Sequence, residues 1–137
     1  MSGKGILAVT GLSARQAGEP SEIDAAGRKL GVRLPGDYCT LLQESDGVEG
    51  FVGPDAYLML WSPHELLELN VAYSVAEFAP GLVLMGTDGG DTGYGFVEGE
   101  TTQYAQVPLV GLSREAAEYM GGTLLEMITR LRGGHPA

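Results

Sequence analysis

The sequence predicts an α+β fold: a single domain with a mainly antiparallel sheet, flanked by helices from the N- and C-terminal ends of the chain. Three observations predict it. Helix signals lie at both ends, short apolar strand signals fill much of the middle, and turn residues rather than helices join the last strands. The length of 137 residues suits one domain, and no linker divides it.

Two helices are predicted near the N-terminus. Ser21 has an acid three residues later, a pattern typical of an N-cap, so the first helix is expected to begin at Glu22 and to stop at Gly31. Pro35 suits the first turn of a helix, where its missing N–H costs nothing. The second helix is therefore expected to start there and to end at Gly47.

A third helix is predicted in the middle of the chain. Ser62 suits its N-cap, Pro63 its first position and Glu65 a capping box, so the helix is expected to run to about Tyr73. Strands are predicted where short apolar or aromatic runs stand between turn residues, at 56–61, 82–86, 94–98 and 103–107.

The C-terminal part is predicted to hold two helical pieces. Ser113 opens a short helical turn that is expected to reach Tyr119. Thr123 and Glu126 form a second capping box, which begins the last helix, and Gly133 ends that helix.

The domain is predicted to span residues 20–132, after an N-terminal arm at 1–19 and before a flexible tail at 133–137. Residues 5–10 are apolar, but the run is short and no small-residue cleavage site follows, so a short strand or arm is expected instead of a signal peptide. Apolar runs stay far below the roughly 18–20 residues that span a bilayer. The single cysteine, Cys39, fits a reducing cytoplasm.

Charge is segregated along the chain. No lysine or arginine occurs from residue 34 to residue 113, where twelve acidic residues lie, while the flanks carry a net +2. Such a field repels nucleic acid and acidic membranes and attracts basic partners. Solubility alone is the alternative explanation for the bias.

The segment MGTDGGDTGYGF, residues 85–96, is interpreted as a turn between two strands. A dinucleotide loop needs its glycines between a strand and a helix, and a phosphate loop needs a lysine, which this chain lacks after Lys29. Asp88 and Asp91 offer oxygen ligands for calcium, but the array of an EF-hand is missing. We therefore expect a tight turn with two carboxylates at its tip, and no cofactor.

The motifs of enzymes are incomplete. His64 and Glu68 share a helix face, but no third zinc ligand is identifiable. Cys39 would need a base within hydrogen-bond reach to act as a nucleophile, and a small core residue is the favoured interpretation. A hydrolase that uses a carboxylate pair stays open, because acids are plentiful. We predict that the chain is not an enzyme.

Five short motifs follow one another in a set order: LGVRLPGDY at 30–38, DGVEG at 46–50, LWS at 60–62, PGL at 80–82 leading into GTDGG at 86–90, and TLLEM at 123–127. This order resembles the SUKH superfamily, the Smi/Knr-type domain. The resemblance implies an α+β fold without a catalytic residue set. Many bacterial members are immunity proteins that neutralise polymorphic toxins, frequently nucleases, and others are regulatory scaffolds.

The resemblance and the charge together predict a cytoplasmic, non-enzymatic protein-binding module. We expect an immunity protein that binds and neutralises a basic nuclease-type toxin through an acidic face. A self-associating regulatory scaffold, for which a homodimer is possible, is the alternative. Trp61 fits either a binding anchor or the core, and the core is favoured. The candidate partner-binding residues are Asp46, Glu49, Asp55, Tyr57, Trp61, Asp88 and Asp91.

Overall fold

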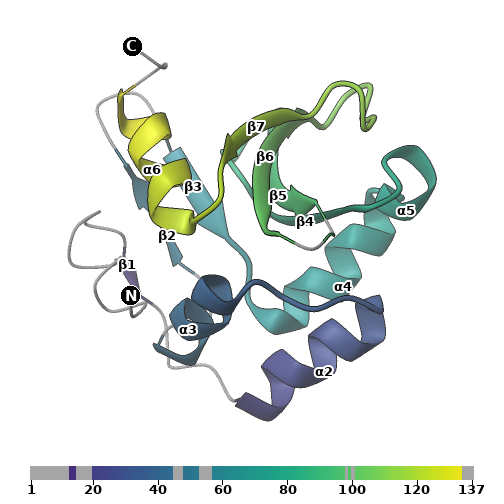
Figure 1. Cartoon of the computed structure of the whole chain (residues 1–137), viewed down its shortest axis with the longest axis vertical. Helices are drawn as coiled ribbons and strands as arrows, with labels where there is room; N and C mark the ends of the chain where they lie inside the picture. The colour runs from purple at the N-terminus through teal and green to yellow at the C-terminus, as the bar shows by residue number, and fades with distance from the viewer. Residues whose placement is uncertain are drawn as a thin grey trace.

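The computed structural model describes residues 13–14, 20–44, 48–52, 57–97, 99 and 101–133. In this part of the chain a seven-stranded sheet has its strands side by side in chain order (Figure 1). Every neighbouring pair is antiparallel. The strands are β1 (Ser13–Ala14), β2 (Val48–Phe51), β3 (Tyr57–Leu60), β4 (Leu82–Thr87), β5 (Thr92–Val97), β6 (Gln103–Pro108) and β7 (Glu118–Gly121).

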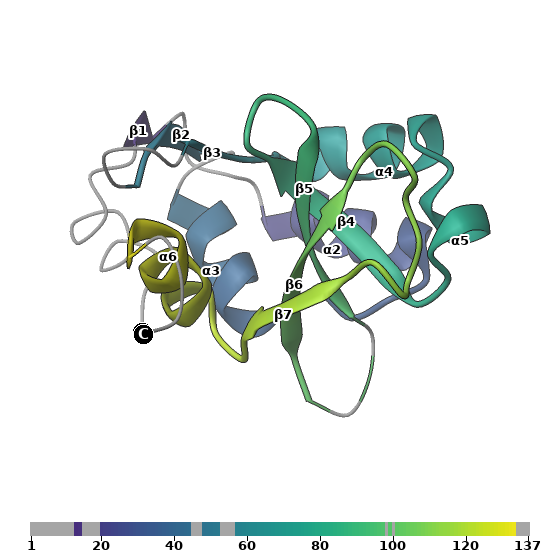
Figure 2. The same cartoon turned by 90° about the horizontal axis from the view of Figure 1, so that it is seen from above.

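The helices of the described residues are α2 (Pro20–Leu30), α3 (Gly36–Glu44), α4 (Pro63–Ala72), α5 (Val75–Phe78) and α6 (Leu124–Gly133). Figures 1 and 2 show α2 beside α4 and α6 beside α3, so the helices from the two ends of the chain flank the sheet. The predicted α+β fold class is confirmed. None of the helices in the described ranges is long and apolar enough to cross a membrane.

The predicted starts of the helices hold to within two residues. Helix α2 begins at Pro20, so Ser21 lies inside the helix and not at its N-cap. The capping box of α4 is confirmed, because the Ser62 hydroxyl accepts a hydrogen bond from the Glu65 N–H at 3.3 Å. In return the Ser62 N–H donates to Glu65 Oε1 at 3.1 Å. The expected stop at Gly47 and the expected strand at 5–10 lie outside the described residues.

The predicted helical turn over residues 113–119 is wrong in its last two residues. A turn exists, since the Ala117 N–H donates to the Arg114 carbonyl at 3.2 Å. Residues 118–121, however, form β7, in which Tyr119 pairs with Ala105 of β6. Backbone hydrogen bonds to β6 stabilise the extended conformation of these residues more than their local sequence favours a helix.

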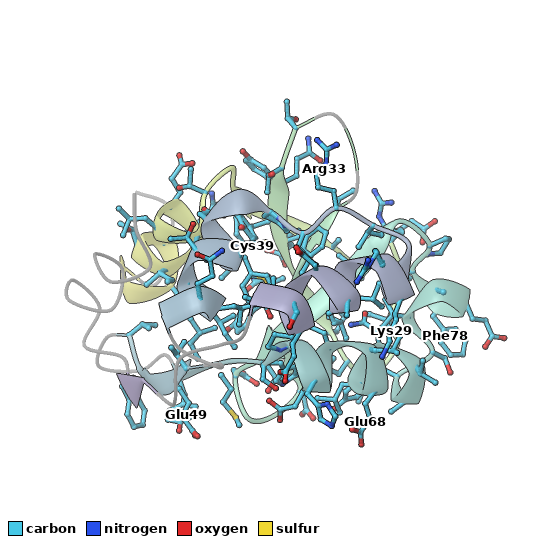
Figure 3. The ribbon with its side chains drawn as sticks, turned by 90° about the horizontal axis from the view of Figure 1, so that it is seen from below. Lys29, Arg33, Cys39, Glu49, Glu68 and Phe78 are labelled. Atoms are coloured by element: carbon cyan, nitrogen blue, oxygen red, sulfur yellow. The ribbon has the colours of Figure 1, made fainter. Side chains whose placement is uncertain are left out.

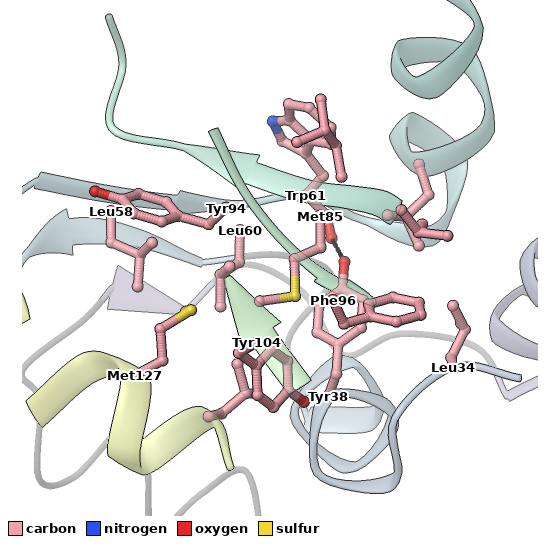
Figure 4. Packing of buried hydrophobic residues seen from close by; sticks show 14 of the residues in the cluster. Leu34, Tyr38, Leu58, Leu60, Trp61, Met85, Tyr94, Phe96, Tyr104 and Met127 are labelled. Carbon is pink, nitrogen blue, oxygen red and sulfur yellow. Dashed lines mark hydrogen bonds between the residues drawn. The ribbon is translucent and has the colours of Figure 1, made fainter. Parts of the chain in front are cut away.

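The core lies between the sheet and the helices (Figure 4). Trp61 is 4% exposed and its ring stacks on that of Tyr73, with ring centres 6.4 Å apart. The Trp61 carbonyl accepts a hydrogen bond from the buried Tyr38 hydroxyl at 2.7 Å. The core interpretation of Trp61 is therefore confirmed, and this ring has little surface left to offer a partner.

Helix α4 is attached to β4 by the side chain of Asn70. Strand β3 pairs with β4 only at Gly86 and Thr87, which leaves the backbone of Leu84 available to the helix. Asn70 Nδ2 donates to the Leu84 carbonyl at 2.8 Å, and Asn70 Oδ1 accepts from the Leu84 N–H at 2.9 Å. A buried amide with both ends bonded in this way positions α4 along the sheet.

The carboxylate of Asp37 joins three distant elements. Its Oδ1 accepts hydrogen bonds from the Tyr38 N–H and from the Tyr104 hydroxyl in β6. Its Oδ2 accepts from the N–H of Leu124, the first residue of α6, at 2.7 Å. A negative charge at the start of a helix is favourable, because the first N–H groups have no partner within the helix.

Candidate partner interface

The β4–β5 connection is a tight turn, which confirms the interpretation of the glycine-rich segment. Asp88 Oδ1 accepts hydrogen bonds from the Gly90 N–H at 2.8 Å and from the Thr92 N–H at 3.2 Å. Gly89 has φ +85°, a backbone conformation that favours glycine. One carboxylate oxygen of Asp88 therefore holds the turn, while Asp91 is exposed at its tip.

The outer face of β2 and β3 carries one acidic and three large apolar or aromatic side chains. In the strand register Glu49 stands opposite Met59, and Phe51 stands opposite Tyr57. Because side chains alternate along a strand, these four residues share one face. The opposite face of β3 holds fully buried leucines and belongs to the core.

Tyr57 is the centre of this face. Its hydroxyl donates to Glu49 Oε2 at 2.7 Å, and this hydrogen bond to a carboxylate raises the pKa of Tyr57. The ring of Phe51 packs edge-on against the ring of Tyr57, with centres 5.0 Å apart and planes at 79°. Phe51 nevertheless remains 64% exposed, so an aromatic surface is presented outward.

The β4–β5 turn lies against the same face. A Cβ atom added to Gly89 would be 3.7 Å from Cδ2 of Tyr57 and 3.8 Å from Sδ of Met59. Figure 2 shows β2, β3 and this turn on one side of the molecule. We call Glu49, Phe51, Tyr57, Met59 and the turn 88–91 the acidic–aromatic surface.

Of the seven candidate residues, Glu49 and Tyr57 are in contact, and Asp88 and Asp91 belong to the turn whose Gly89 lies next to Tyr57. Asp46 and Asp55 lie outside the described residues, and Trp61 is buried. Phe51 and Met59 were not among the candidates. If residues 48–51 had been predicted as a strand, the alternation of side chains would have placed Phe51 on the same face as Glu49 and made it a candidate.

The acidic charge of this side continues onto α4. Figure 3 shows Glu49 and Glu68 along one side of the molecule and Arg33 on the opposite side. Within the described ranges, Glu49, Glu68 and Asp91 form no ion pair. Two other acids of the basic-free stretch serve the fold, since Asp37 caps α6 and Glu65 completes the capping box of α4.

Cys39 lacks the surroundings of a nucleophile. Burial raises the pKa of its thiol, and Asp24 and Asp37 raise it further. The thiol lines a cavity of about 710 Å³ beside α2, whereas His64 lines a different groove. The cysteine–histidine pair that a thiol hydrolase needs is therefore not assembled by these two residues. Across the residues that the structure describes, no group of three or more His, Cys, Asp or Glu could hold a metal ion.

The comparison with family models adds a finding that is independent of the geometry. The model described as the SMI1 / KNR4 family (SUKH-1) matches residues 19–126, which is more than half of the 137-residue chain. The matched range includes the acidic–aromatic surface and the start of α6. A comparison with curated proteins finds no match.

Proposed function

Because the chain belongs to the SMI1/KNR4 family (SUKH-1), as its motif order predicted, we propose that it neutralises a basic toxin by covering it with the acidic–aromatic surface. Membership of this family is consistent with an immunity-type module. The toxin proposed is a nuclease, because a nuclease must present basic residues to the phosphates of its substrate. The same basic residues would then meet the carboxylates of this chain.

The observation that carries the proposal is the Tyr57–Glu49 hydrogen bond beside the exposed ring of Phe51, with the acidic turn 88–91 next to Tyr57. Exposed aromatic side chains are the residue types that contribute most to binding free energy when they become buried at an interface. Carboxylates around them accelerate encounter with a basic partner and select against acidic ones. Phe51 and Tyr57 supply the aromatic side chains, and Glu49, Asp88 and Asp91 supply the carboxylates.

The surface is held in place before any partner arrives. The Tyr57 hydroxyl fixes the Glu49 carboxylate, and the backbone N–H groups of Gly90 and Thr92 fix that of Asp88. Side chains that are already ordered lose less conformational entropy on binding. Tight binding through a small surface is therefore favoured.

The experiment compares two triple variants that change the net charge equally. The surface triple is Glu49→Gln, Asp88→Asn and Asp91→Asn. The remote triple is Asp24→Asn, Glu115→Gln and Glu118→Gln, which are exposed residues outside this surface. The gene next to this one is first searched for a nuclease toxin domain; each variant is then titrated with that domain, and affinity and residual nuclease activity are measured at two salt concentrations.

We expect the surface triple to weaken binding roughly 10- to 100-fold and to reduce its salt dependence. The remote triple should change affinity by less than about threefold, since charge outside the contact acts only through long-range steering. Equal losses in both triples would assign the effect to net charge, and unchanged binding in both would reject this surface as the contact.

Self-association is the second candidate, and the sheet edge supports it. Strand β7 is the last strand in the order of the described sheet, and Tyr119 on it is 56% exposed. An edge strand of this kind can pair with another copy. Light scattering over a wide range of protein concentrations tests this candidate, and a constant monomer mass would remove it.

A further inference from the structure

A groove runs between α2 and α4 and continues to α5. Its first half has a volume of about 540 Å³ and its second half about 530 Å³. Both halves are lined by Lys29, Leu67 and Val71, so they form one continuous groove. Figure 3 shows α2 and α4 lying side by side and labels Lys29 and Glu68, both of which line the first half of the groove.

The groove presents apolar side chains to solvent. Val71, which lines both halves of the groove, is 68% exposed although it lies on the helix that packs against α2. Leu67 is half-buried, and the small side chain of Ala25 leaves room on the α2 side. An exposed valine beside half-buried apolar residues in one groove leaves apolar surface that a partner could cover.

The rim of the groove is acidic. Glu22 and Glu68 border its first half and Glu77 its second, and all three are exposed. Lys29 is the one lysine or arginine that lines it in the described part of the chain. None of the three glutamates forms an ion pair with a described residue, so their charge is available to a partner.

We propose that this groove receives an amphipathic basic helix of the partner protein. The apolar face of that helix packs on Leu67 and Val71, while its lysine or arginine side chains meet Glu22, Glu68 and Glu77. The inference rests on the proposed function in one respect, the basic character of the partner. A second copy of this chain is a poor occupant, because its net charge of −10 would oppose the acidic rim.

The probe is a synthetic peptide of leucine and lysine, about 18 residues long, with the leucines on one helical face. Two further peptides serve as controls: a leucine–glutamate peptide with the same apolar face, and a lysine–serine peptide with the same charge but no apolar face. Binding is followed by NMR shifts of the methyl groups of Ala25, Leu67 and Val71 and of the backbone of Phe51 and Tyr57.

We expect the leucine–lysine peptide to shift the groove methyls and to bind at least tenfold more tightly than either control. The variant Val71→Ser should weaken it about tenfold. The matched variant Val110→Ser removes another exposed valine, on the β6–β7 loop, and should leave the affinity unchanged.

Equal binding of the lysine–serine peptide, or shifts confined to Phe51 and Tyr57, would overturn the groove assignment. Concentration-dependent dimers with shifts at the groove methyls would also overturn it, in favour of a second copy. In either case the surface triple should still weaken binding of the nuclease. The two proposals can therefore be rejected independently of one another. Loss of the groove signal together with no effect of that triple would reject both.

Discussion

The carboxylate of Asp37 accepts a hydrogen bond from the Leu124 N–H at 2.7 Å, across 87 residues of chain. The same carboxylate accepts from the hydroxyl of Tyr104, whose side chain is fully buried. A single acid at the start of α3 therefore positions both the last helix and a central tyrosine. This acid is structural, although it belongs to the basic-free stretch that the sequence linked to partner binding.

The variant Asp37→Ala should lower the free energy of unfolding by about 2–3 kcal/mol, because it leaves the buried Tyr104 hydroxyl without this acceptor and removes the charge from the start of α6. Urea denaturation followed by circular dichroism measures the change. Asp24→Ala, an exposed acid on α2, is the control and should cost less than about 0.5 kcal/mol. Similar losses in the two variants would contradict the role given to Asp37.

The variant Gly86→Ala should destabilise the protein by about 1–3 kcal/mol or more. A Cβ atom at this position would be 2.1 Å from the Met59 carbonyl oxygen, so β3 and β4 would have to separate where they are joined by only two residue pairs. Gly36→Ala is the matched control, since a Cβ atom there meets nothing within 4 Å and the residue opens α3. We expect Gly36→Ala to be neutral or to stabilise by up to about 1 kcal/mol in thermal unfolding.

Stability should fall as the pH rises from about 10 to about 12. Burial, aided by Asp88, raises the pKa of Tyr94 to about 12 from its ordinary value of 10. In this window the unfolded chain loses the phenolic proton while the folded chain keeps it, so alkali favours unfolding. Urea titrations at several pH values measure the slope.

Tyr94→Phe should make that slope shallower without abolishing it, because burial and Asp37 also raise the pKa of Tyr104. At neutral pH neither tyrosine ionises in either state, so the variant should not alter the pH dependence there. An unchanged slope above pH 10 in Tyr94→Phe would refute the assignment to this residue.

Cys39 should react slowly with iodoacetamide at pH 7.5, at least several-fold more slowly than free cysteine. The thiolate is the reactive form, and burial together with Asp24 and Asp37 raises the pKa of the thiol. Mass spectrometry after timed alkylation gives the rate, and the rate should rise toward that of free cysteine in 8 M urea, about the concentration at which small domains are unfolded. A rate in the folded protein that matches or exceeds that of free cysteine would restore the thiol hydrolase alternative.

Features encoded by neighbouring residues were predictable from the sequence. The capping box of Ser62 and Glu65 forms as expected, and so does the turn around Asp88, because each needs only residues within three or four positions of one another. Strand β7 was missed for the opposite reason, since its conformation depends on β6. Helix α5 was also missed. It follows Ser74, which has a left-handed φ of 53°. Because this residue is not a glycine, the sequence gives no sign of that backbone conformation.

The candidate site was predictable in part, for the same physical reason. Glu49 and Tyr57 were chosen for charge and aromatic character, but their hydrogen bond depends on the register of β2 and β3. The groove between α2 and α4 was not predicted at all. Val71 appears as an ordinary apolar residue of an amphipathic helix, and only the packing of the two helices leaves it exposed.

The order of the strands also bears on how the protein is made. Each strand of the described sheet lies next to the one synthesised just before it, so a chain emerging from the ribosome can add strands one at a time without leaving gaps to be filled later. Helix α6 is different, because Asp37, whose carboxylate accepts the Leu124 N–H, is synthesised 87 residues earlier and must wait for this partner until α6 itself has been made.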